Sequence, residues 1–243
     1  MGKGEIIMPK YQNVVSLGFF CSPAIELNNL NLRKSSQPFD WLISSKFNQV
    51  LELINNGFED FLNPDFLFQL KQYPRYYRNI KYDIDFYHDF DELKSFNKQI
   101  DKIKQKYDRR IARFYNTIKE PTLFLRYICS KEEVVYINNN YEKISKLLKT
   151  YNANNDIIFV ANKEDSYLKT SSDIKVWYVE KDNNDVVARH FLQKNPEIKA
   201  YILKNVSANN EAPHKLHKKS MPETILRKLC RFLHMYYYHK QTI

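Results

Sequence analysis

The sequence predicts an α/β fold in which a mainly parallel sheet is flanked by helices in three layers, with a basic amphipathic helix at the C-terminus. Short apolar runs suited to buried strands alternate along the chain with stretches whose apolar residues recur at helical spacing. Hydrophobic residues make up 43% of the 243 residues and charged residues 27%, a composition typical of a globular protein. Only four residues are glycine and no glycine-rich phosphate loop occurs, which argues against a nucleotide-binding fold.

The fold is expected to begin with a strand, a tight turn and a helix. Residues 13–17 form an apolar run that ends at Gly18 and is short enough for a buried strand. Ser22 and Pro23 follow, and a capping residue before a proline is typical of the first turn of a helix. A second helix is predicted over residues 47–56, before Gly57.

The rest of the body continues the alternation of strands and helices. Apolar residues at spacings of three and four predict one long helix from Asp91 to just before Pro121. Further strands are expected at 122–128, 156–161 and 175–179, and further helices at 141–148 and 186–192. The aromatic segment 58–87 contains two prolines and no clean period, so we expect loops and short elements there.

Charge divides the chain into a body of residues 1–212 and a basic tail of residues 213–243. The tail carries seven Lys or Arg and one Glu, a net charge of +6 out of +10 for the whole chain. Its apolar and basic residues recur on separate arcs at helical spacing, which indicates a basic amphipathic helix. Such a helix either binds an anionic membrane surface or packs on the core, and nucleic acid is the less favoured partner because no nucleic-acid-binding motif accompanies the charge.

The N-terminal segment and the cysteines predict the cell compartment. The apolar stretch near the N-terminus is too short for a signal peptide or a membrane span. Three scattered cysteines favour neither a disulfide framework nor a metal site. We therefore expect a cytoplasmic protein, peripheral on the inner face of the membrane if the tail binds there, with no cofactor.

Cys21 is the candidate nucleophile. It lies between a predicted strand and the start of a helix, where free N–H groups and the helix dipole stabilise a thiolate. The alternative is a small buried side chain, the ordinary role of a free cysteine. A cysteine nucleophile needs a base, and His88 is the best placed of six histidines, with Asp40 or Asp89 to orient its ring.

Arginines form the candidate anion-binding set. Arg126 follows an apolar strand and Arg33 follows the first helix, while Arg113 lies on the long helix beside Arg110. Guanidinium groups at such positions can bind a carboxylate or a phosphate, although an ion pair or a solvated helix face would explain them equally well.

Several of these residues carry a resemblance to a known family. The stretch Ser16-Leu17-Gly18 with Cys21 and Ala24, then Leu32-Arg33, then Ser36-x-Pro38-Phe39-Asp40-Trp41, resembles the opening of a bacterial family of unknown function catalogued as papain-like cysteine peptidases. The later His88-Asp89, Arg110-x-x-Arg113 and Leu123-Phe124-x-Arg126 blocks follow in the expected order, so the likeness covers roughly residues 13–127. The resemblance implies a cysteine nucleophile at Cys21 and a histidine base at His88, and a genetic link to surface polysaccharides.

Two functions from different classes follow. The first is a cysteine-nucleophile hydrolase or transferase acting on a glycan, acyl or peptide substrate, with substrate contacts from Arg126, Arg33, Trp41, Ser16, Gly18 and Arg113. The second is a non-catalytic binding or scaffold protein, associated with glycan or membrane, in which the aromatic segment 58–87 stacks on sugar rings.

Overall fold

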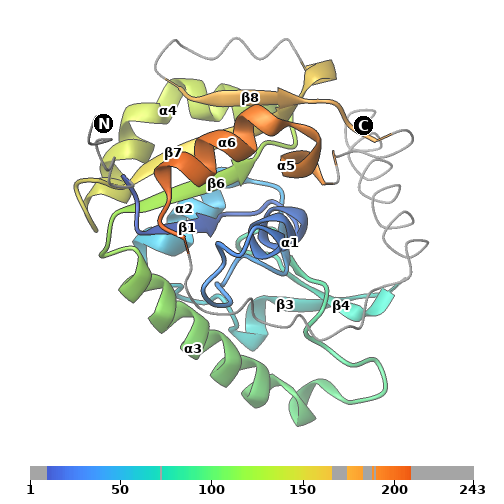
Figure 1. The fold of residues 1–243 in the computed structure, drawn as a ribbon. Coiled ribbons are helices and arrows are strands. Elements are labelled where there is room, and N and C mark those ends of the chain that lie inside the picture. Colours follow the sequence, from blue (N-terminus) through green and yellow to red (C-terminus); the bar gives the residue numbers. More distant parts are fainter. Residues whose placement is uncertain (1–9, 72, 166–173, 183–187, 189, 209–243) are drawn as a thin grey trace, which may run out of the picture.

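Four parallel strands form a sheet through the middle of the protein, in the order β1-β6-β7-β8 (Figure 1). They are β1 Asn13–Ser16, β6 Thr122–Tyr127, β7 Asp156–Asn162 and β8 Val176–Val179. The structure is a computed structural model and describes residues 10–71, 73–165, 174–182, 188 and 190–208. All four predicted strands are confirmed. The basic tail of residues 213–243 lies outside the described residues.

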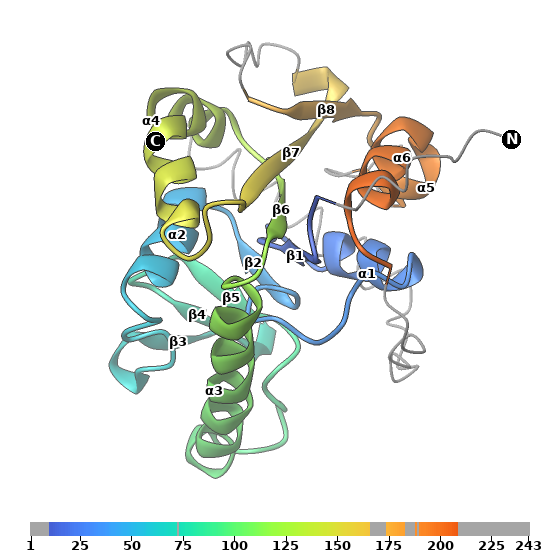
Figure 2. The same ribbon diagram turned by 60° about the vertical axis from the view of Figure 1, so that its left-hand side comes forward.

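Helices pack on both faces of the parallel sheet because successive side chains of its strands point to opposite sides. Phe124 of β6 and Phe159 of β7 belong to a core shared with α2, α3 and α4, whereas Leu125 and Ile158 belong to a core shared with α1, α5 and α6. Figure 2 shows α2 and α4 on one side of the sheet and α1, α5 and α6 on the other. The helices are α1 Ser22–Asn29, α2 Phe47–Asn55, α3 Ile100–Thr117, α4 Lys131–Lys149, α5 Phe191–Lys194 and α6 Pro196–Asn205.

A second, antiparallel sheet was not predicted. Its strands have the order β2-β5-β4-β3, with β2 Leu42–Ser44, β3 Leu67–Leu70, β4 Tyr73–Asn79 and β5 Ile84–Phe86. Three of these strands fall in the segment 58–87, where loops and short elements were expected. The pattern was hidden because β4 mixes aromatic, basic and proline residues without a period of two, and its register with β3 shifts between Gln69 and Leu70. The three-layer description therefore fits the parallel sheet alone.

Helix boundaries also differ from the prediction. The long helix begins at Ile100 rather than near Asp91, because the side-chain amide of Gln99 binds the backbone of Asp91 and Lys94 and closes a loop there. The helix predicted at 141–148 is the C-terminal part of a longer helix, α4, which begins at Lys131. The helix predicted at 186–192 is replaced, among the described residues, by α5 from Phe191, and α6 was not predicted.

Candidate functional site

Cys21 lies where the sequence placed it, after β1 and at the start of α1. It is the N-cap residue of α1, and its carbonyl oxygen accepts a hydrogen bond from the backbone N–H of Ile25 at 3.0 Å. Its side chain is partly exposed and packs against the core on the α1 side of the parallel sheet. The thiol thus lies at the carboxyl edge of the sheet, beside the positive end of a helix dipole, which stabilises a thiolate.

The turn before Cys21 depends on Gly18 and Ser16. Gly18 has φ +89°, a conformation that favours glycine, and its N–H donates to Oγ of Ser16 at 3.1 Å. A Cβ atom at Gly18 would lie only 2.6 Å from Oγ of Ser44 and 3.0 Å from Nη1 of Arg126. Ser16 and Gly18 therefore shape the loop that carries Cys21, a role that the packing alone explains.

Arg33, Asp40, Trp41 and His88 form a continuous row of contacts. Nε and Nη2 of Arg33 both lie 2.8 Å from Oδ2 of Asp40, and the Arg33 guanidinium lies 5.5 Å from the ring of Trp41. The ring of Trp41 in turn meets His88 edge to face at 5.9 Å. The row exists because β2 and β5 pair with Leu42 opposite Phe86, which brings the residues just before β2 beside those just after β5.

The predicted orientation of His88 by a carboxylate does not form. Asp40 is 1% exposed and accepts from Arg33 and from the backbone N–H of Gln37, while Asp89 pairs with Lys106 and accepts from the Tyr107 hydroxyl at 2.9 Å. The imidazole reaches the surface on one side, yet desolvation by its neighbours lowers the pKa of His88 to about 4. Its ring is thus neutral at pH 7 and a weak proton acceptor.

Arg126 is a structural residue in this conformation, contrary to the predicted substrate contact. Its side chain is 0% exposed, and its Nε lies 2.6 Å from Oε1 of Glu133. Nη1 donates to the Leu17 carbonyl at 2.7 Å and to Oγ of Ser44 at 2.9 Å, and Nη2 donates to the Ser44 carbonyl at 2.6 Å. With four bonds made and no surface, the guanidinium cannot meet a ligand without rearrangement.

Cys129 offers a contrast to Cys21. It follows β6, and its Sγ lies 3.3 Å from Oε2 of Glu133 and 3.4 Å from the carbonyl of Ser45. Burial and the neighbouring Glu133 carboxylate raise the pKa of the Cys129 thiol well above its usual value. Cys129 is therefore held as a thiol, which leaves Cys21 as the candidate nucleophile among the described cysteines.

A carboxylate and a histidine that were not predicted as site residues meet beside α1. Glu26 is 1% exposed, and its Oε1 lies 3.3 Å from Nδ1 of His190, whose side chain is 57% exposed. Oε2 accepts from the backbone N–H groups of Leu192 at 3.2 Å and Gln193 at 3.3 Å, which fixes the carboxylate against the start of α5. A buried carboxylate that holds one ring nitrogen of an exposed histidine leaves the other nitrogen free for proton transfer.

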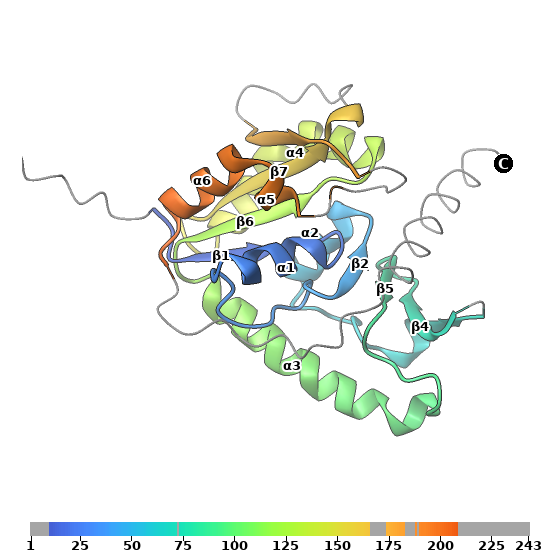
Figure 3. The same cartoon turned by 45° about the vertical axis from the view of Figure 1, so that its right-hand side comes forward.

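Cys21 and His190 lie on the same side of the parallel sheet. Figures 1 and 3 both show α5 beside α1, and Glu26 lies five residues after Cys21, about 7.5 Å along the helix axis. The chain neighbours of Cys21 and His190 both pack against Tyr127. The ring centroid of Phe20 lies 5.5 Å and that of Phe191 5.6 Å from the centroid of the Tyr127 ring.

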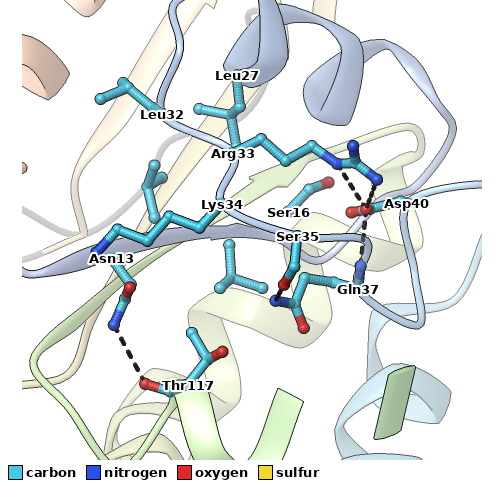
Figure 4. A pocket seen from close by; sticks show the side chains of 12 residues that line it. Asn13, Ser16, Leu27, Leu32, Arg33, Lys34, Ser35, Gln37, Asp40 and Thr117 are labelled. Atoms are coloured by element: carbon cyan, nitrogen blue, oxygen red, sulfur yellow. Dashed lines mark hydrogen bonds and ion pairs between the residues drawn. The ribbon is translucent and has the colours of Figure 1, made fainter. Parts of the chain in front are cut away.

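A pocket of about 50 Å³ opens beside β1, at the edge of the parallel sheet (Figure 4). Its lining brings together three of the predicted site residues, Ser16, Arg33 and Asp40, with Thr117 from the end of α3. Cys21 and His88 are not among the lining residues. Arg113 lies one helical turn before Thr117 on α3 and is exposed. The predicted site residues thus divide between the Cys21 loop, the Arg33 to His88 row and this pocket.

The described residues hold neither a candidate metal site nor a helix that could span a membrane. In the part of the chain that the structure describes, no group of three or more His, Cys, Asp or Glu side chains is arranged to hold a metal ion. Within the same residues, no helix is both long and apolar enough to cross a bilayer.

Comparison with known proteins supports the resemblance carried by the N-terminal half. An uncharacterized protein of Acanthamoeba polyphaga mimivirus is 33% identical over 123 residues, which is 42% of this chain and 54% of that protein. The chain therefore spans about half the length of this relative. No solved structure matches. The family described as "Putative papain-like cysteine peptidase" matches residues 12–165. These residues include Cys21, His88, the residues that line the pocket, the antiparallel sheet, and strands β1, β6 and β7 of the parallel sheet. The chain belongs to this family of papain-like cysteine peptidase domains.

Proposed function

We propose that the protein is a cysteine-nucleophile hydrolase or transferase in which Cys21 attacks an acyl group and His190, held by Glu26, takes the thiol proton. The observation that carries the proposal is the position of Cys21, which combines partial exposure with the start of α1 at the carboxyl edge of the parallel sheet. Ligand sites of open α/β sheets form at this edge.

The reaction has two stages in this proposal. Nε2 of neutral His190 accepts the proton of Cys21, the thiolate forms a C–S bond to the substrate carbonyl carbon, and the leaving group departs with that proton. Water, or another hydroxyl or amine acceptor, then gives its proton to the same imidazole and displaces Cys21 from the thioester. The Glu26 carboxylate, held against Nδ1, stabilises the imidazolium that forms in each stage.

His190 is preferred to His88 as the base because of what each ring contacts. His190 has a buried carboxylate on Nδ1, whereas His88 contacts Trp41 and Tyr87 and has a pKa near 4. The Glu26 carboxylate orients the His190 ring and stabilises the imidazolium that forms when the ring accepts a proton. His88, with Asp40 or Asp89, stays the alternative that the sequence predicts.

The substrate is proposed as a peptide, an acylated glycan or another acyl compound, and a role in surface-polysaccharide biosynthesis remains a prediction of the resemblance. The non-catalytic alternative keeps Phe68, which is 52% exposed, as its sugar-stacking candidate in the segment 58–87. Other aromatic rings of that segment are buried. Phe58, Phe61 and Phe86 lie in the core, and Tyr76 and Tyr87 are buried and stack on each other at 4.3 Å.

The rate of thiol alkylation tests the assignment. Iodoacetamide at pH 7 is expected to modify Cys21 faster than Cys129. His190→Gln is expected to slow the reaction at Cys21 roughly tenfold or more, because it removes the base that takes the thiol proton. Glu26→Gln should act in the same direction, and His88→Gln is the matched control. A larger effect of His88→Gln would return the base to His88, and slower modification of Cys21 than of Cys129 in the wild type would refute the nucleophile.

Catalysis and binding separate in a second experiment. Cys21→Ala should abolish the cellular function of the protein at unchanged expression if Cys21 is catalytic. Unchanged function in that variant would leave the binding or scaffold role in place.

A further inference from the structure

The pocket beside β1 is surrounded by more positive than negative charge. Arg33 and Lys34 line it, and Asp40 is the only acidic residue among its lining side chains. Oδ2 of Asp40 already accepts from Arg33 and from the backbone N–H of Gln37 at 2.8 Å, as Figure 4 shows.

One face of α3 adds two further cations on this side. Arg110, Arg113 and Thr117 are spaced by three and four residues, so they share a face of the helix, and Thr117 lines the pocket. Burial raises the pKa of Asp40, and the positive charges of Arg33 and Arg110 oppose that rise. Burial and then the charges of Arg110, Arg109 and Arg33 lower the pKa of Arg113. Arg33, Arg110 and Arg113 therefore lie close enough to repel one another, and Asp40 is the carboxylate that all three cations share.

Arg110 also leaves a hydrogen-bonding group unused. Its Nη1 is buried and has no acceptor within the described residues, although its guanidinium lies 5.0 Å from the ring of Tyr107. A buried charged donor without a partner costs free energy, so it needs an explanation in the structure or in a ligand. The amide oxygen of Gln37, which lines the pocket, is likewise buried without a donor.

We propose that a phosphate group binds at this pocket, with Arg33 from its lining and Arg110 and Arg113 from the adjoining face of α3 as the cations that meet its oxygens. A phosphate dianion offers acceptors to several guanidinium groups at once, and it relieves the repulsion that a single carboxylate leaves. A protonated oxygen, which inorganic hydrogen phosphate and the monoanion of a phosphate ester both carry, supplies the donor that Gln37 lacks. The group is either free phosphate or the phosphate of a larger molecule.

The phosphate site is independent of the proposed reaction at Cys21. The residues that line it do not include Cys21, His190 or Glu26. It would hold a second ligand or the phosphorylated end of a substrate, and its test reads binding rather than turnover.

Thermal unfolding with added phosphate tests the site on the full-length protein. Inorganic phosphate and glycerol phosphate are each added at an ionic strength matched with sodium chloride, and the melting temperature is followed as a function of concentration. A saturable rise with phosphate beyond that with chloride is expected. Saturation at a lower concentration of glycerol phosphate than of inorganic phosphate identifies the ligand as the phosphate of an ester, and the reverse order identifies it as the free ion. A melting temperature that follows ionic strength alone overturns the site.

Substitutions on α3 locate the binding. Arg110→Met keeps the contact with the Tyr107 ring and is expected to weaken the apparent affinity for phosphate at least about tenfold, the effect of one charge-assisted hydrogen bond. Lys102→Met removes the same charge from an exposed position on the same helix and should leave the affinity within about twofold. Without phosphate, Arg110→Met should melt at or above the wild-type temperature because repulsion is relieved. Equal loss in both variants, or a marked destabilisation of Arg110→Met without phosphate, would show Arg110 to be structural and overturn the proposal.

Discussion

Gly18→Ala should destabilise the protein far more than Gly57→Ala, although both glycines have a positive φ. Gly18 has φ +89° and Gly57 has φ +74°, so alanine is strained at either position. A Cβ atom at Gly57 would have no heavy atom within 4 Å, whereas at Gly18 it would lie 2.6 Å from Oγ of Ser44. Gly57→Ala therefore measures the backbone cost alone, and the difference between the two variants measures the clash.

The expected magnitudes follow from these contacts. A left-handed L-residue costs roughly 1–2 kcal/mol, and the reduced freedom of the unfolded chain returns about 0.4–1 kcal/mol, so Gly57→Ala should lose about 1 kcal/mol. Gly18→Ala adds overpacking of about 1–3 kcal/mol. Moving Ser44 also breaks its bond to buried Arg126, for about 1 kcal/mol more, since Nη1 of Arg126 keeps its bond to the Leu17 carbonyl. The total for Gly18→Ala is about 3–5 kcal/mol.

Thermal and urea unfolding measure both losses. For a chain of this size, about 3–5 kcal/mol lowers the melting temperature by about 6–20 °C, against about 2–4 °C for Gly57→Ala. Adding Ser44→Ala removes the clashing oxygen, so Gly18→Ala should cost less in that background, which a double-mutant cycle detects. Equal losses for Gly18→Ala and Gly57→Ala, or no coupling with Ser44→Ala, would refute the packing argument.

Three further predictions concern charge. Arg126→Met should lower the free energy of unfolding by about 3–5 kcal/mol, because it leaves Glu133 buried without its partner. The double variant Arg126→Met with Glu133→Leu should recover much of this loss in urea unfolding. A loss under about 1 kcal/mol for Arg126→Met would contradict the buried pair. NMR titration of His88 should give a pKa near 4 rather than 6.5. Since the unfolded state then binds more protons between these values, stability should rise with pH across this window, less steeply in His88→Gln. A measured pKa at or above 6.5 would contradict the desolvation of the ring by its neighbours. Full-length protein should co-sediment with anionic vesicles at low salt and be released at high salt, and truncation before Pro213 should abolish this binding; loss of the melting transition on truncation would instead place the tail in the core.

The sequence was informative where local rules decide the structure. The apolar run before Gly18 and the Ser22-Pro23 pair predicted β1, the start of α1 and therefore the position of Cys21. These elements depend on strand burial and helix capping, which involve neighbouring residues only. The turn geometry that holds the nucleophile was predictable for the same reason.

The site residues that were missed or reassigned depend on contacts between distant segments. Glu26 and His190 are 164 residues apart, and only the packing of α5 on α1 brings them together. The structural role of Arg126 could have been predicted, because a charged residue inside a strand that is buried on both faces requires a partner. Glu133, in the first turn of α4, is that partner. The antiparallel sheet gave no such signal, since aromatic packing rather than alternation defines β4.

The bonds of Arg126 have a consequence for how the molecule opens. The guanidinium belongs to β6, yet it is bonded to Leu17 after β1, to Ser44 at the end of β2 and to Glu133 in α4, so it joins the parallel and the antiparallel sheets. Detaching the antiparallel sheet alone would remove two acceptors from a charge that stays inside the remaining structure, which costs several kcal/mol. The two sheets should therefore behave as one cooperative unit, and amide hydrogens of β2 and β6 should exchange with solvent through the same global opening.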